Sequence, residues 1–269
     1  MTAGCEVDKP LIHMASLPSG RALGPIPVRE AAHQACEHAL RRAVLDGELA
    51  AGQRLPPERE LATTLGVSRL TLRAALATLT AQGVLAVRHG SGYVVQDVRR
   101  TGGPDLLPGL AALAQSRGDL PAIAAELLRV RRHLARAVLE HLAEHPPRAA
   151  DVRAFLRAVD DMAVVAERTS HDLDNLAAVD LAIVQALLDA TRSPVLRLCL
   201  NPVMAVVNNS PALRAAMYRA PLANVLGWRA LGTWLSAPDA AEIDRVIQIL
   251  HERDRATHEL LRRTSRKAS

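Results

Sequence analysis

The feature that most constrains this chain is the stretch from Glu58 to Arg73, which has the residue spacing of two short helices joined by a tight turn. Two helices cross closely only where a small side chain lies at their contact, and Ala62 provides it. Four residues later the turn needs a backbone that tolerates a positive φ, which Gly66 adopts without steric cost. Ser68 then offers a favourable N-cap for the second helix. The stretch therefore predicts a helix-turn-helix.

Further elements are predicted on both sides of this unit. An apolar stripe at helical spacing predicts a helix over 28–45, and Pro57 is a good first position for the next one. Two β-prone runs, 84–87 and 93–95, flank a glycine-rich tip, which is typical of a hairpin. We therefore expect a winged helix-turn-helix. Its predicted inner face consists of Leu61, Leu65, Val67, Leu72 and Ala75.

The first turns of the second helix of such a unit face the major groove of DNA. Here they carry Ser68, Arg69, Thr71 and Arg73. Arginine can bond guanine O6 and N7 in a bidentate manner, whereas hydroxyls suit phosphates or base edges. The alternative is a solvated helix face with two arginines. The adjoining glycine turn and hairpin favour the DNA-reading interpretation.

The hairpin tip is a second predicted contact with DNA. Gly90 and Gly92 let the backbone pass close to a strand, and His89 or Arg88 can enter the minor groove or meet a phosphate. An ordinary hairpin turn is the alternative for His89, because glycine is common in turns.

Several short motifs in this region resemble the GntR-type winged helix. They are LPPERELA at 55–62, GVSR at 66–69, RAAL at 73–76, GVL at 83–85 and HGSGYVV at 89–95, within a resemblance that covers 28–96. By position, the resemblance implies Arg59, Arg69 and Arg73 as the main DNA contacts. It gives Ser68 and Thr71 supporting roles, and it places His89 and Gly90 at the wing tip.

The rest of the chain is predicted to be helical. The chain is 49% hydrophobic but only 2% aromatic, so its core must consist mainly of Leu, Ala and Val, which are common in helical proteins. Prolines divide the second half into six or seven predicted helices, which favours an antiparallel all-α bundle. We expect a mainly α protein with a flexible arm (1–24), a winged helix-turn-helix domain (25–98), a linker (99–104) and an effector-binding and dimerisation bundle (105–265).

Charge and cysteines narrow the class of protein further. The formal charge is +5 with a pI near 9.7, which fits an anionic partner such as nucleic acid, and equally a basic protein of no special function. The three cysteines (Cys5, Cys36 and Cys199) are far apart and odd in number, which argues against a disulfide scaffold and suits a reducing cytosol. Nothing approaches the roughly 18 apolar residues of a membrane span. We expect a cytoplasmic protein without a membrane partner.

The second half resembles the effector domain of the FadR branch of the GntR family, at 106–113, 127–131, 180–184 and 193–196. Many members of this group hold a metal through an aspartate, a histidine four residues later and two further histidines. Here Asp180 remains, but Val184, Ile243 and Thr264 are assigned to the histidine positions. One carboxylate cannot hold a transition metal without its imidazoles, so we expect no metal and no cofactor.

Other histidines leave a different metal site geometrically open. Asp254 and His258 lie one helical turn apart with His251 nearby, and His141 and His145 are also four residues apart. A convincing site needs three or four convergent ligands, so solvated polar residues on helices are the favoured interpretation.

The FadR-like resemblance implies an effector held in the bundle, and a long-chain fatty acyl-CoA is the first candidate. An interior of Leu, Ala, Val and Ile can bury an acyl chain. Arg131 matches an arginine of the domain's first long helix and can meet an anionic group, with a salt bridge as the alternative. Thr257 and Leu261 stand where the family's fatty acid regulator has a serine and a tryptophan. The predicted effector residues are Arg131, Asp180 and Thr257.

These observations favour a ligand-responsive transcriptional regulator that binds a palindromic operator as a homodimer. A small carboxylic acid metabolite is the alternative effector, and an architectural DNA-binding protein is the alternative function. An enzyme is not expected, because the sequence holds no P-loop, G-x-S-x-G or H-E-x-x-H motif. The adjacent Asp160 and Asp161 are interpreted as a solvated face.

Overall fold

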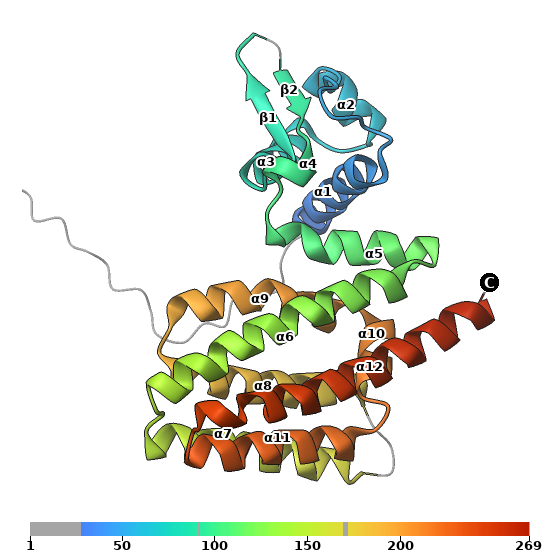
Figure 1. Ribbon diagram of the computed structural model, residues 1–269. Helices are drawn as coiled ribbons and strands as arrows, with labels where there is room; N and C mark the ends of the chain where they lie inside the picture. The colour runs from blue at the N-terminus through green and yellow to red at the C-terminus, as the bar shows by residue number, and fades with distance from the viewer. Residues whose placement is uncertain (1–27, 91, 169–171, 269) are drawn as a thin grey trace, which may run out of the picture.

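The computed structural model describes residues 28–90, 92–168 and 172–268, which form a small winged domain and a larger helical bundle (Figure 1). The predicted arm, residues 1–24, lies outside the described residues. The winged domain comprises helices α1 (Val28–Asp46), α2 (Glu58–Thr64) and α3 (Arg69–Ala81) and strands β1 (Leu85–Arg88) and β2 (Gly92–Val95).

The winged domain has its own core, built around α3. Leu72, Leu76 and Leu79 of α3 are buried and pack against α1, and each such leucine contributes about 1.5–3 kcal/mol through burial. The two strands pair antiparallel, with Leu85 opposite Val95, and both side chains close the core from the other side. The inner face is close to the predicted one. Leu61, Ala62, Leu72 and Ala75 are buried, and Leu65 and Val67 are half-buried against the same cluster.

The chain leaves this domain through a short helix α4 (Val98–Thr101) and a 3-10 turn η1 (Pro104–Leu106). The Thr101 hydroxyl donates to the backbone oxygen of Gly83 at 2.7 Å, which ties α4 to the end of α3. Gly83 has φ +72°, and a Cβ there would lie 2.2 Å from the Thr101 oxygen, so only glycine fits. Leu106 belongs to the winged core, whereas Leu107 packs against the bundle core. We propose that residues 99–104 are the linker between the two domains.

The bundle is all-helical, as predicted, and within the described residues it has one helix more than the six or seven expected. The addition is the short α10, which Ser210 and the following proline separate from α9. The bundle comprises α5 (Leu107–Arg117), α6 (Leu120–Glu144), α7 (Ala149–Ala166), α8 (Leu173–Thr191), α9 (Pro194–Asn209), α10 (Pro211–Met217), α11 (Pro221–Ser236), η2 (Ala240–Glu242) and α12 (Ile243–Ala268).

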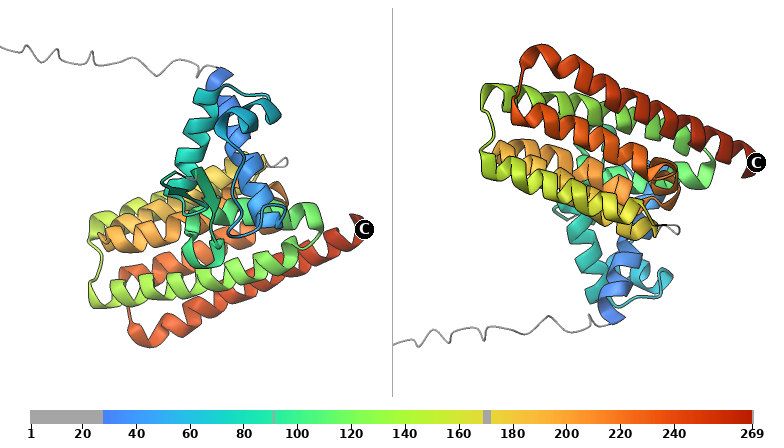
Figure 2. Two further views of the ribbon diagram at one scale, coloured as in Figure 1. Left: turned by 90° about the horizontal axis from the view of Figure 1, so that it is seen from above. Right: turned by 90° about the horizontal axis from the view of Figure 1, so that it is seen from below.

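Layers of helices surround the bundle core (Figure 2). Helix α7 packs on α8 and α11, and α6 packs on α12 and α9. The one phenylalanine of the chain, Phe155, is fully buried at the centre, and most of the surrounding core is Leu, Val and Ala, as the composition predicts. None of the described helices is long and apolar enough to cross a membrane.

Helix α5 connects the two domains. It contacts α1 of the winged domain on one side and α6 and α9 of the bundle on the other. Arg117 at its end forms an ion pair with Asp46 at the end of α1. A Cβ at Gly109 would lie 3.0 Å from Arg41 Cδ, so α5 and α1 approach closely here.

Candidate DNA interface and effector site

Local hydrogen bonds fix the start of α3. The backbone N–H of Thr71 donates to Ser68 Oγ at 3.1 Å, so Ser68 is the N-cap of α3, as predicted. Gly66 in the preceding turn has the predicted positive φ, +65°. The Ser68 and Thr71 hydroxyl oxygens also lie 2.8 Å apart, so one of the two O–H groups donates within the pair and the other stays free for a DNA phosphate.

The three arginines assigned to DNA contact are all exposed. Arg69 lies in the first turn of α3, and Arg59 lies on α2. Arg73 Nε donates to Glu58 Oε2 at 2.6 Å across the α2–α3 contact. This hydrogen bond and the carboxylate's charge raise the pKa of Arg73 above its ordinary value. Arg73 is thus held in an ion pair with Glu58 at the surface of the winged domain.

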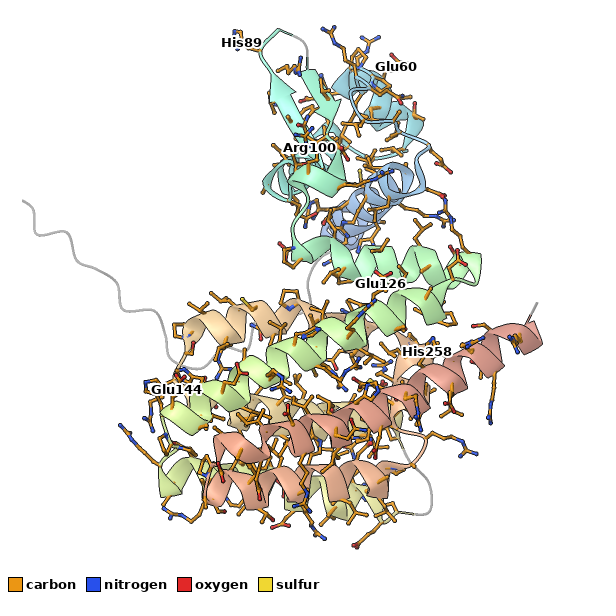
Figure 3. The ribbon with its side chains drawn as sticks, viewed as in Figure 1. Glu60, His89, Arg100, Glu126, Glu144 and His258 are labelled. Carbon is orange, nitrogen blue, oxygen red and sulfur yellow. The ribbon has the colours of Figure 1, made fainter. Side chains whose placement is uncertain are left out.

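The wing brings its predicted contact to the same end of the domain. His89 and Gly90 are exposed at the end of β1, and Gly90 has φ +71°. Figure 3 shows His89 at the wing tip and Glu60 on α2, both at the end of the winged domain that points away from the bundle. The exposed His89 of the wing and Glu60 of α2 thus lie at the same end of the winged domain.

Sequence reasoning missed Leu70, which is 72% exposed between Arg69 and Thr71. A single exposed leucine is ordinary in itself. In the first turn of a recognition helix, however, an apolar side chain can contact the methyl group of thymine. The signal was available, since the buried stripe of α3 leaves Leu70 on the opposite face.

In the bundle, Asp180 of α8 is a buried carboxylate held by two aromatic side chains. The Tyr218 hydroxyl donates to Asp180 Oδ2 at 3.1 Å, and Trp228 Nε1 donates to Oδ1 at 2.6 Å. Burial and the charge of Asp180 raise the pKa of the Tyr218 phenol well above its ordinary value. Three elements, α8, the end of α10 and α11, therefore meet at this carboxylate.

A second buried carboxylate, Asp254 of α12, holds two arginines of α6. Arg131 bonds its Oδ1, and Arg132 Nη1 donates to its Oδ2 at 2.7 Å. The Arg131 side chain is only 12% exposed, and its Nε has no hydrogen-bond partner. For Arg131 the structure thus shows the salt bridge that sequence analysis gave as the alternative, with one N–H left over.

Arg253 was not singled out from the sequence, and the charges of both carboxylates act on it. Burial lowers the pKa of its guanidinium, while the charge of Asp180 opposes that shift. Its Cζ lies 5.9 Å from the centre of the Trp228 ring. Nothing in the local sequence separates Arg253 from the many other arginines of the chain, because its surroundings come from distant helices.

Two cavities meet at Arg131 and Arg253, which line both. The first has a volume of about 90 Å³ and is otherwise mostly apolar, with Val184, Leu139 and Leu231 among its walls. The second, of about 130 Å³, is more polar and includes Arg219, Asn224 and Thr257. An apolar cavity and a polar cavity therefore adjoin, and the guanidinium groups of Arg131 and Arg253 lie at their boundary.

The three predicted effector residues lie close to this arrangement in different ways. Arg131 lines both cavities, and Thr257 lines the polar one, where its hydroxyl donates to the Arg253 backbone oxygen at 3.0 Å. Asp180 lines neither cavity but acts electrostatically on Arg253. Leu261 is buried in the core.

The assignment of Ile243 and Thr264 to the positions of metal-binding histidines is wrong. Both residues are on α12, 21 positions apart, which separates them by roughly 31 Å along the helix axis. They cannot both face Asp180. The side chains that do contact it are Tyr218 and Trp228. Among the described residues, no group of three His, Cys, Asp or Glu side chains could hold a metal ion.

The paired histidines have structural partners. The rings of His141 and His145 stack with centroids 4.7 Å apart, and His141 Nε2 lies 2.9 Å from the backbone oxygen of Thr191. His251 is exposed on α12.

The family comparison matches the winged domain and not the bundle. Residues 32–95 match the family model described as bacterial regulatory proteins, gntR family. These residues are therefore similar to the winged helix-turn-helix domain of the GntR family. The match runs from the second turn of α1 to the end of β2, and so it includes every predicted DNA contact from Arg59 to Gly90.

Relatives of known name extend the similarity beyond that domain. An HTH-type transcriptional regulator of Mycobacterium tuberculosis is 37% identical over 158 residues, which is 58% of this chain and 60% of the relative. A fatty acid metabolism regulator protein of Yersinia enterocolitica is 33% identical over 151 residues, 56% of this chain and 58% of the relative. The matched region thus spans about three fifths of the length of these curated relatives.

One solved structure shares the fold over most of the chain. It comes from work on Lar of Listeria monocytogenes, which controls expression of that organism's agr system. The TM-score is 0.57 at 18% identity, over 90% of this chain and 99% of the other. At that identity the comparison shows the fold alone, that is, a winged helix-turn-helix followed by a helical bundle.

Proposed function

We propose that this protein is a ligand-responsive transcriptional regulator that acts in the cytoplasm and binds a palindromic operator as a homodimer. The observation that carries the proposal is the first turn of α3. There Arg69 and Leu70 are exposed next to Ser68, the N-cap of the helix. The GntR-family match to the same residues supports it.

A homodimer follows from the small size of the reading unit. One recognition helix contacts too few base pairs to be selective, whereas two related by a two-fold axis read a palindrome. We assign the association of the two copies to the helical bundle. An architectural DNA-binding protein has no need of such a domain with internal cavities, which favours the regulator.

Sedimentation and operator binding test this proposal together. We expect a dimer at micromolar concentration and an affinity that falls steeply with salt, because bound arginines release phosphate counterions. A monomer that still binds one half-site tightly would contradict the dimer. An operator affinity that no ligand changes would favour the architectural protein instead.

We further propose a long-chain fatty acyl-CoA as the effector, bound without metal. The apolar cavity offers burial at about 25 cal/mol per Å², and Arg131 and Arg253 offer charge to the anionic end. The similarity to a fatty acid metabolism regulator protein supports this class of ligand.

The size of the cavity constrains how such a ligand binds. At about 90 Å³ it is smaller than a cavity of about 150 Å³ that holds benzene, so a long acyl chain enters only if the bundle opens. That opening gives the ligand a way to change DNA affinity, because a ligand shifts a conformational equilibrium only through unequal affinity for its two states.

Operator release by palmitoyl-CoA, with coenzyme A alone as control, tests the effector. Chelator-treated protein should respond as fully as untreated protein. Ala135→Leu, which fills the apolar cavity, should weaken the response at least tenfold, whereas Ala122→Leu on the exposed face of the same helix should not. If palmitoyl-CoA has no effect and a small carboxylate acts only with added metal, the proposal is wrong.

A small carboxylic acid is the second candidate effector, and the polar cavity favours it. That cavity has about 130 Å³, and its walls carry three arginines, Arg131, Arg219 and Arg253, against one carboxylate, Asp254, which Arg131 already binds. A metal-independent response to a short carboxylate that Arg253→Gln abolishes, and that Ala135→Leu leaves unchanged, would identify this alternative.

A further inference from the structure

A larger hollow lies outside the bundle, at the junction of the two domains. Its volume is about 340 Å³, against about 90 Å³ for the apolar cavity of the bundle, and the two share no lining residue. Within the described residues, helices α1 and α5 form its walls. Its lining residues are His38, Ala39, Arg41, Arg42, Leu45, Gly109, Ala112, Leu113 and Ser116.

The spacing of these residues explains why the hollow exists. On α5 the lining residues follow one helical face, with Gly109, Ala112 and Ser116 as its small members. Two opposed helix faces ordinarily fill the space between them with large side chains. Here α1 and α5 approach closely at Gly109, where Arg41 Cδ would lie 3.0 Å from an added Cβ, and they meet again at the Arg117–Asp46 ion pair. Small residues leave the remaining space open.

The α1 wall of the hollow is basic. Arg42 and His38 are exposed there, and the lining residues that the structure describes include no acidic side chain. Arg41 is buried and forms an ion pair with Glu37, but its Nε has no hydrogen-bond partner. Nearby Asp46 is engaged by Arg117. The wall therefore offers unsatisfied donors and positive charge, while Leu45 and Leu113 supply apolar surface.

We propose that this junction hollow is a second ligand site, which takes a medium-chain carboxylate. The carboxylate lies against Arg42 and His38, and the alkyl chain lies along Leu45, Ala112 and Leu113. Scaling from the cavity of about 150 Å³ that holds benzene, the hollow suits a ligand of roughly a dozen non-hydrogen atoms. A ligand there bridges α1 to α5 and so holds the winged domain against the bundle.

Photolabelling of the full-length protein tests the site, with a decanoate that carries a diazirine as the probe. Labelled peptides should contain residues 38–45 or 109–116, and unmodified decanoate should compete whereas decanol should not. Arg42→Gln should lower labelling at the junction at least fivefold. Arg129→Gln, an exposed arginine on α6, should leave it unchanged.

A second variant covers the apolar half of the hollow. Ala112→Phe fills the space and should abolish labelling at the junction, while Ala122→Phe on the exposed face of α6 should not. The proposal is overturned if labels appear only in α6 to α12, or if Arg42→Gln labels as strongly as wild type. Because the two cavities are separate, either result leaves the proposed function standing.

Discussion

The arginines of the winged domain and those of the bundle differ in what surrounds them. On α3, Arg69 is exposed, and Arg73 forms an ion pair with Glu58 at the surface. In the bundle, Arg131 and Arg132 are mostly buried and share Asp254. Surface arginines can meet a polyanion with little loss of hydration. Buried ones are already bound, so an anionic effector must compete with a carboxylate for them.

The largest expected effect tests the buried half of this comparison. Asp254→Asn leaves Arg131 and Arg132 without their carboxylate in a mostly buried place, and it should lower the free energy of unfolding by about 3–5 kcal/mol. Urea unfolding followed by circular dichroism measures this change.

Asp244→Asn is the matched control on the same helix. Asp244 pairs with Arg136 but is 85% exposed, so water replaces the lost interaction and little change in stability is expected. Equal losses for the two variants would show that burial does not distinguish these ion pairs.

The next effect concerns the exposed half. Arg69→Ala should cost about 1–3 kcal/mol of discrimination between operator and random DNA, the worth of one bidentate guanine contact. The side chain is exposed, so helix content and thermal melting should stay the same. Competition binding with both DNAs measures the discrimination. Selectivity equal to wild type would remove Arg69 from the reading surface.

The same contrast explains what could be predicted from the sequence. The winged domain is a local motif, so the spacing of Ala62, Gly66 and Ser68 was enough to place its turn and its cap. The outward direction of Arg69 follows from the same helical period. The exposure of Leu70 follows from that period too, because the buried Leu72 and Leu76 lie on the other side of α3.

The bundle site could not be placed in this way, because residues far apart in the chain form it. Asp180 meets Tyr218 and Trp228 across 38 and 48 positions, and Arg131 meets Asp254 across 123. No period or motif records such pairings. The assignment of Ile243 and Thr264 to metal-binding positions by resemblance was also wrong, because the two residues lie far apart on the same helix, α12.

Leu70→Ala should have a smaller effect, confined to sites with thymine. Loss of contact with one thymine methyl should cost about 1 kcal/mol, comparable to one buried CH₂ group. Replacing operator thymines by uracil removes the same methyl from the DNA side. The two changes together should cost no more than either alone, whereas fully additive losses would show that Leu70 does not touch a thymine methyl.

The smallest effect is a gain, and it tests whether Glu58 restrains Arg73. Glu58→Gln removes a negative charge that binds Arg73 Nε at 2.6 Å, so the guanidinium becomes free to meet DNA. The operator affinity should rise by about two- to fivefold, the range expected for one exposed ion pair. Fluorescence anisotropy with labelled operator resolves a change of this size.

Glu60→Gln removes the same charge from α2 but frees no arginine, because Glu60 makes no ion pair in the described chain. Both variants lose repulsion from DNA phosphates, so the difference between them isolates Arg73. If Glu60→Gln raises the affinity as much as Glu58→Gln, general charge explains the gain. If Glu58→Gln lowers the affinity instead, the carboxylate positions Arg73 for DNA, and the surface arginine resembles those of the bundle.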